Sequence, residues 1–122
     1  MKTRTGDYPI GFRRGGGAWQ RDAETVIAWM EANGLEVIDL GRDADRSAGP
    51  YLDAGIRVGS VDLAEREGMI SADAGQRKEA VARNTEYIRN CTAEGMTNFF
   101  VVMLPADAAL PRAENFSYLV ES

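Results

Sequence analysis

The feature that most limits the fold of this chain is an unbroken apolar run, Phe-Phe-Val-Val-Met-Leu at 99–104, which Pro105 ends. A strand with one face in water alternates apolar and polar residues, whereas a strand covered on both faces is apolar throughout. The run is too short to cross a bilayer as a helix, which takes about 20 residues. It therefore predicts a buried strand over 98–104 in a parallel sheet, and no membrane-spanning segment.

Three further segments have the composition of strands, because they are short, rich in Val, Ile, Phe or Leu, and bounded by Gly, Asn, Asp or Pro. They cover residues 9–12, 36–40 and 57–61. Helical periods and capping residues between the strands predict helices at about 19–33, 50–54 and 71–95, with another beginning at Leu110. Strands that alternate with helices build a parallel sheet with crossover helices.

The apolar residues of each predicted helix recur at steps of three and four, which places them on one face. On the first helix this face comprises Trp19, Ala23, Val26, Ile27 and Met30. On the long helix it comprises Ala74, Val81, Thr85, Ile88 and Cys91, and on the last helix Phe116, Leu119 and Val120. We expect these faces to pack inward, with Cys91 as a core residue rather than a nucleophile.

Composition and charge indicate one ordinary globular domain over residues 1–122. Lys and Arg number 14 against 19 Asp and Glu, and the net charge of -5 opposes binding to a nucleic-acid backbone. The one cysteine cannot form an internal disulfide, and no apolar segment follows the basic N-terminal residues, so no secretion signal is expected. We therefore expect a cytoplasmic protein without nucleic-acid or membrane partners.

Polar residues follow the predicted strands, at the end where parallel sheets and barrels hold their functional groups. Arg13 follows the first strand, Arg42 the second and Asp62 the third. An arginine can clamp a phosphate or carboxylate through two N–H groups, and an aspartate can accept hydrogen bonds from sugar hydroxyls, so we predict that these residues contact substrate. The alternative is a structural role, as a solvated charge, a turn carboxylate or an ion pair with a neighbour such as Asp43.

Four segments together resemble the first four strands and strand exits of one family. They are Tyr-Pro-Ile-Gly-Phe-Arg at 8–13, Leu-Glu-Val-Ile-Asp-Leu-Gly-Arg at 35–42, Val-Gly-Ser-Val-Asp-Leu at 58–63 and Phe-Val-Val-Met-Leu-Pro at 100–105. Their order and spacing resemble sugar phosphate isomerase/epimerase proteins of the xylose-isomerase-like TIM barrel superfamily. Leu-Pro-Arg-Ala-Glu-Asn-Phe at 110–116 resembles the start of that family's fourth helix. The resemblance implies an α/β fold that forms the N-terminal half of a (β/α)8 barrel, with four strands, three crossover helices and the start of a fourth.

The same resemblance implies a divalent metal ion, Mn²⁺ or Mg²⁺, held by Glu, Asp and His side chains of later strands, where it polarises the oxygens of a sugar. This chain contains no histidine, and no residue in it matches a metal position, so we expect no metal ligand and no cofactor within it. The activity implied is isomerisation or epimerisation of a sugar or sugar phosphate in carbohydrate metabolism.

Three functions remain open at this point. The chain can be the N-terminal portion of such an enzyme, which supplies substrate-binding rim residues and is inactive alone. It can instead be a non-catalytic half-barrel that forms a homo-oligomer through its exposed strand edges. The third alternative is a flavodoxin-like module that binds a small molecule, for which a fifth strand would be expected.

Overall fold

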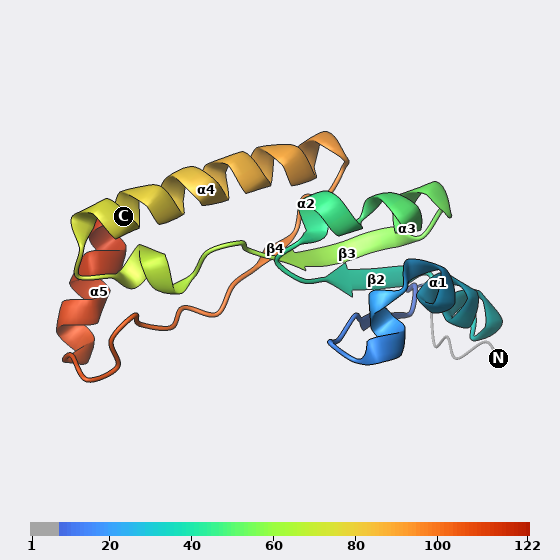
Figure 1. Ribbon diagram of the computed structural model, residues 1–122, viewed down its shortest axis with the longest axis horizontal. Coiled ribbons are helices and arrows are strands. Elements are labelled where there is room, and N and C mark those ends of the chain that lie inside the picture. The colour runs from blue at the N-terminus through green and yellow to red at the C-terminus, as the bar shows by residue number, and fades with distance from the viewer. Residues whose placement is uncertain (1–7) are drawn as a thin grey trace.

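A four-stranded parallel sheet organises the part of the chain that this computed structural model describes, residues 8–122 (Figure 1). Its strands are β1 (Gly11–Arg13), β2 (Val37–Leu40), β3 (Arg57–Asp62) and β4 (Phe99–Phe100). They lie in the order β1-β2-β3-β4, so each strand pairs with the next strand of the chain. The α/β class and the parallel sheet are therefore confirmed. Residues 1–7, which bear on the secretion signal, lie outside the described residues.

Helices connect the strands as expected, with different boundaries. The helical elements are η1 (Ala18–Arg21), α1 (Ala23–Ala32), α2 (Ala44–Ser47), α3 (Gly49–Asp53), η2 (Glu67–Ile70), α4 (Ala74–Ala93) and α5 (Arg112–Glu121). The predicted helix at 19–33 is interrupted at Asp22, whose side chain accepts a hydrogen bond from the Thr25 backbone N–H and caps α1. The short helix α2 was not predicted, and no helix within residues 8–122 is long and apolar enough to cross a membrane.

The main core lies on one face of the sheet, between the strands and α1 to α4. Ile38 and Leu40 of β2 are fully buried, and strand alternation points both to that face. The buried residues that pack with them come from all four of these helices and from the junction of α2 and α3: Val26, Met30, Ala44, Ala48, Tyr51, Tyr87 and Cys91. The prediction that Cys91 is a core residue is confirmed. The helices therefore form one layer, and the opposite face of the sheet is left with Val37, Asp39 and the strand-end charges.

The fourth strand is shorter than predicted. Only Phe99 and Phe100 pair with β3, and β3 itself ends at the partner of Phe100, Asp62. Beyond that point Val102, Met103 and Leu104 leave the sheet and are 41–45% exposed. The prediction of a buried strand over 98–104 is wrong for its second half, because no neighbouring strand among the described residues continues far enough to pair with it.

The inner face of α4 is rotated relative to the prediction. Of the five residues expected to face inward only Cys91 is buried, and Ile88 is exposed. The buried residues are instead Arg77, Ala80, Asn84, Tyr87 and Cys91. Two of these are polar, and each is buried with specific partners, which apolar periodicity cannot anticipate.

The last helix, α5, does not cover the sheet. It packs on η2 and the start of α4, beyond the carboxyl ends of the strands, around a second cluster of Met69, Ile70 and Ala80 (Figure 1). Arg77 fastens it there, because its guanidinium donates to Glu121 at 2.7 Å and lies 5.2 Å from the ring centroid of Tyr118. Leu119 packs on this cluster as expected.

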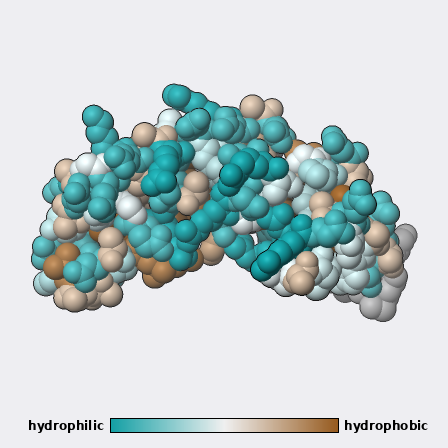
Figure 2. Space-filling model, viewed as in Figure 1, coloured by the Kyte–Doolittle hydropathy of each residue, from teal (hydrophilic) through white to brown (hydrophobic). Residues whose placement is uncertain are grey.

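The other two residues of the predicted apolar face of α5 do not pack inward. Phe116 is 64% exposed and Val120 69% exposed. The molecule is consequently an arch, with the sheet at one end, α5 at the other and α4 spanning them (Figures 1 and 2). Its lower side is hollowed, and hydrophobic surface gathers on the lower side of the end that holds α5 (Figure 2).

Candidate functional site

The carboxyl edge of the sheet brings two of the three predicted site residues into direct contact. Arg13 ends β1 and Asp62 ends β3, and the guanidinium Nη2 of Arg13 donates to Oδ2 of Asp62. The contact crosses the end of β2, whose Asp39 is the register partner of Arg13 and so lies on the same sheet face. This face is the one that α1 to α4 leave uncovered.

Asp39 belongs to this group, although the strand-exit argument did not single it out. Its Oδ1 accepts a 2.7 Å hydrogen bond from the Ser60 backbone N–H of β3. Gly59 leaves room for it, since a Cβ at that position would lie 2.7 Å from both Asp39 Oδ1 and Val37 Cγ1. The signal that could have found Asp39 is its place between Ile38 and Leu40, because a charged residue between two buried ones must point to the opposite face.

The charges around Arg13 make this group better suited to bind a ligand that donates hydrogen bonds than a ligand anion. The hydrogen bond to Asp62, together with the charges of Asp62 and Asp39, raises the pKa of Arg13 against the opposing effect of burial. Two carboxylates face one guanidinium, and the second oxygen of Asp62, Oδ1, is buried and has no hydrogen-bond partner among residues 8–122. Arg13 is therefore engaged by an ion pair, with Asp62 and not with Asp43, whereas Asp62 retains an unused acceptor. Asp43 pairs instead with Arg14 at 2.7 Å.

Arg42 is the freer of the two predicted arginines. It follows β2 on an exposed position, and its nearest carboxylate oxygen, on Glu67, is 4.0 Å away. Glu67 is held more closely by Arg66 at 2.6 Å, and hydrogen bonds from its own backbone N–H and from Arg66 hold the pKa of Glu67 below its usual value. The guanidinium of Arg42 consequently remains available to a ligand anion.

All three predicted residues lie at the same edge of the sheet. Arg42 and Asp62 line one small cavity of about 30 Å³ together with Arg66 and residues 100–102. Arg42 also lines a polar cavity of about 280 Å³ between α2 and α4, which includes Arg46 and Arg83. The edge thus combines a carboxylate acceptor with an adjacent, weakly paired cation.

The loop after β3 is fixed to α4 by a residue that the sequence did not indicate. Asn84 accepts a 2.8 Å hydrogen bond from the Glu65 backbone N–H and donates to the Glu65 carbonyl oxygen at 3.0 Å. Since Arg66 and Glu67 follow directly, Asn84 positions the loop that lies against Arg42.

The metal that the family resemblance implies does not fit the described residues. Across residues 8–122, no three His, Cys, Asp or Glu side chains gather in a way that could hold a metal ion. One oxygen of Asp39 is engaged by the Ser60 N–H and one oxygen of Asp62 by Arg13.

Comparison with known proteins does not assign a family. No protein-family model matches the chain, and no curated protein matches it.

Proposed function

We propose that this chain is the N-terminal half of a (β/α)8 barrel of the sugar phosphate isomerase/epimerase type, and that it binds substrate at its rim without catalysing the reaction alone. In this proposal Arg42 holds the phosphate or another anionic group of the sugar, and Asp62 accepts a sugar hydroxyl. The observation that carries the proposal is the meeting of Arg13, Asp39 and Asp62 at the carboxyl ends of consecutive parallel strands.

The strand order supports a half-barrel over a flavodoxin-like module. A flavodoxin-like sheet reverses its direction of winding, so its first strand lies between the second and third. Here the order is sequential, and α1 to α4 share one core on one face. Sequential winding with helices on one side is the arrangement of a barrel wall, whose uncovered face becomes the interior.

The geometry also refines the roles of the two arginines. Arg13 is held by Asp62, so its part is to orient that carboxylate and leave Oδ1 for a hydroxyl donor. Among the described residues, the one carboxylate that Arg42 contacts is Glu67, at 4.0 Å, so Arg42 can turn toward an incoming anion. A sugar phosphate offers both kinds of group, which suits a carboxylate beside a weakly paired guanidinium.

Departures from a barrel wall are confined to the fourth unit. β4 has two residues and α5 packs on η2, so the proposal rests on the first three strands and the first residues of the fourth. The outer edge of β4 has no neighbour within the described part of the chain. A strand edge without a partner is a template for another strand, and the exposed Val102 and Met103 beside it favour the second candidate, self-association as a homo-oligomer.

Calorimetric titration tests the proposed rim with fructose 6-phosphate and fructose as probes. We expect the phosphorylated sugar to bind more tightly, and Arg42→Gln to remove about tenfold of that affinity, equal to about 1.4 kcal/mol. Arg89→Gln is the matched control, because Arg89 is an exposed arginine of α4 that lines neither of the cavities that Arg42 lines. Equal affinity for both sugars, or equal effects of the two substitutions, would refute the assignment of Arg42, and a concentration-dependent dimer in sedimentation would favour the second candidate.

A further inference from the structure

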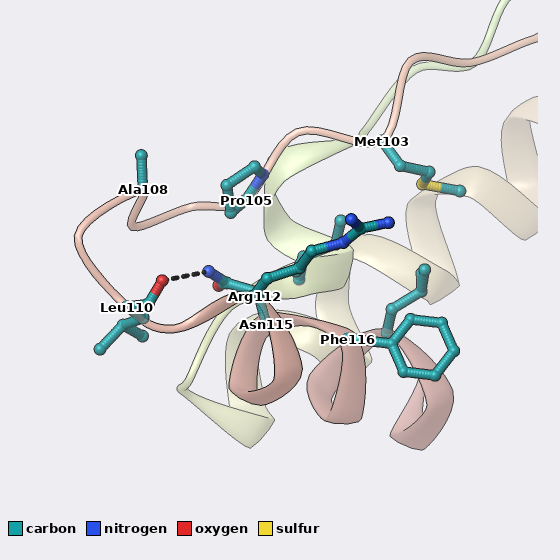
Figure 3. Close-up of a pocket in the computed structure, with 9 residues that line it drawn as sticks. Met103, Pro105, Ala108, Leu110, Arg112, Asn115 and Phe116 are labelled. Carbon is teal, nitrogen blue, oxygen red and sulfur yellow. Dashed lines mark hydrogen bonds between the residues drawn. The ribbon is translucent and has the colours of Figure 1, made fainter.

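A cavity of about 500 Å³ lies between α5 and the segment that leads into it (Figure 3). Most of its wall is apolar and comes from η2, from residues 103–110 and from α5, including Ile70, Met103, Pro105, Leu110, Phe116 and Leu119. Small-molecule sites typically enclose about 300–1,000 Å³. None of its lining residues belongs to the rim described above, so this site is independent of the proposed function.

One cation stands at this apolar cavity without a counter-charge. Arg112, the first residue of α5, lines the cavity, and its side chain extends in the direction of Met103 and Phe116 (Figure 3). Within residues 8–122 its guanidinium makes neither an ion pair nor a hydrogen bond. Seven of the eleven arginines in residues 8–122 lie within 4.0 Å of a carboxylate oxygen. Arg112 does not, and an unpaired guanidinium beside apolar walls is suited to an external anion.

A buried acceptor in the same wall is also unsatisfied. Asn115 is 91% buried, and its Nδ2 donates to the carbonyl oxygens of Asp107 and Leu110 at 3.1 and 3.2 Å. These two acceptors fix which end of the amide is nitrogen, because the flipped amide would set oxygen against oxygen. Oδ1 of Asn115 is consequently a buried acceptor, and no described residue donates to it. Buried polar atoms in folded proteins nearly always have a partner, so this one indicates a donor from outside residues 8–122.

We propose that this cavity binds a small amphipathic carboxylic acid. Its apolar body lies among Met103, Leu110 and Phe116, its carboxylate pairs with Arg112, and an N–H or O–H group elsewhere in the ligand donates to Asn115 Oδ1. Among the described lining residues Arg112 is the one cation, which matches one negative charge rather than the two of a phosphate monoester. The apolar wall matches the tail, which a free sugar lacks.

Titration of the ¹⁵N-labelled protein with N-octanoylglycine tests this site, because the probe carries an apolar tail, one amide N–H and one carboxylate. We expect saturable shifts confined to the backbone amides of residues 69–70 and 103–119. The methyl ester of the probe lacks the charge, and N-octanoylsarcosine lacks the N–H, so each should bind about tenfold more weakly than the parent probe.

Substitutions separate the contribution of the charge from that of the cavity. Arg112→Gln should weaken binding of N-octanoylglycine about tenfold and leave binding of its ester within about twofold, whereas the control Arg89→Gln should leave both unchanged. Ala108→Phe places a ring in the cavity from an exposed loop position, and it should abolish binding while the circular dichroism spectrum stays that of the wild type.

Three results would overturn the proposal. The first is the absence of saturable shifts at the cavity, and the second is equal affinity for the acid and its ester. The third is a shift of the same amides with protein concentration in the absence of probe, which would mean that a second copy of the chain covers the cavity.

Discussion

Replacement of Asn84 by alanine tests how the rim loop is attached to the helix layer. The Asn84 side chain is 95% buried and exchanges two hydrogen bonds with the backbone of Glu65, at 2.8 and 3.0 Å. Alanine removes both and leaves the Glu65 N–H and carbonyl to find water or remain unpaired. At about 1 kcal/mol for each bond, we expect the free energy of unfolding to fall by about 2 kcal/mol.

Urea denaturation followed by circular dichroism measures this change. For a chain of this size a urea dependence of about 1.5 kcal/mol per molar is reasonable, so the midpoint should fall by about 1.3 M. The backbone amides of Arg66 and Glu67 should also exchange faster with solvent, because the loop they belong to loses its attachment to α4.

Asn90→Ala is the matched control for this substitution. Asn90 lies on the same helix, six residues further on, and is exposed. Both changes gain the same helix propensity, so the difference between the two variants reports the hydrogen bonds of Asn84 alone. A difference below about 0.5 kcal/mol would refute the reasoning, since it would mean that Asn84 contributes no more than a surface residue.

Two further predictions concern the sheet and the core. Gly59→Ala should lower the free energy of unfolding by about 1–3 kcal/mol, because its Cβ would meet Asp39 Oδ1 and Val37 Cγ1 at 2.7 Å. The control Gly16→Ala has open space around it and should change the free energy of unfolding by less than about 0.5 kcal/mol. Thermal unfolding compares the two variants, and equal melting temperatures would contradict the crowding at Gly59. Burial raises the pKa of the Cys91 thiol, so its contribution to stability should be complete below about pH 8.5 and be lost as the pH rises through the raised pKa of the folded state. Cys91→Ala should therefore make the free energy of unfolding less dependent on pH in that range. An unchanged pH dependence would show that unfolding does not change the titration of the thiol.

The sheet could be predicted from the sequence because its signals are local. Each of the strands β1 to β3 is a short apolar segment between turn residues, and each overlaps its predicted range. The fourth could not be delimited in this way. Its apolar run reads as a buried strand, but pairing needs a neighbour, and β3 ends where Phe100 pairs. The length of a strand depends on the rest of the sheet, which composition does not report.

The face of α4 was predicted wrongly for a different reason. Apolar periodicity selected a stripe that includes Val81 and Ile88, whereas the helix buries a stripe that contains Arg77 and Asn84. Both polar residues are buried because of partners distant in sequence: Arg77 bonds Glu121 of α5, and Asn84 bonds Glu65. A hydrophobicity pattern assigns such residues to solvent, so it cannot recognise a helix whose inner face is held by hydrogen bonds.

The sequence predicted where the candidate site residues lie, but not which of them form ion pairs or hydrogen bonds with one another. The rule that parallel strands carry functional groups at their carboxyl ends placed Arg13, Arg42 and Asp62 at one edge. The ion pair of Arg13 with Asp62 spans the end of an intervening strand, so it required the strand order. Asp39 was accessible to strand alternation, whereas the need for Gly59 beside it follows only from the register of β2 and β3.

The measurement that tests the proposed rim most directly is a ¹⁵N chemical-shift titration with fructose 6-phosphate. If the rim binds the sugar phosphate, the amides that shift are those beside Arg42, Asp62 and residues 99–101, and the shifts shrink in Arg42→Gln but not in Arg89→Gln. Shifts confined to the residues around α5, or none at millimolar sugar phosphate, would contradict the assignment of the carboxyl edge as a sugar phosphate site.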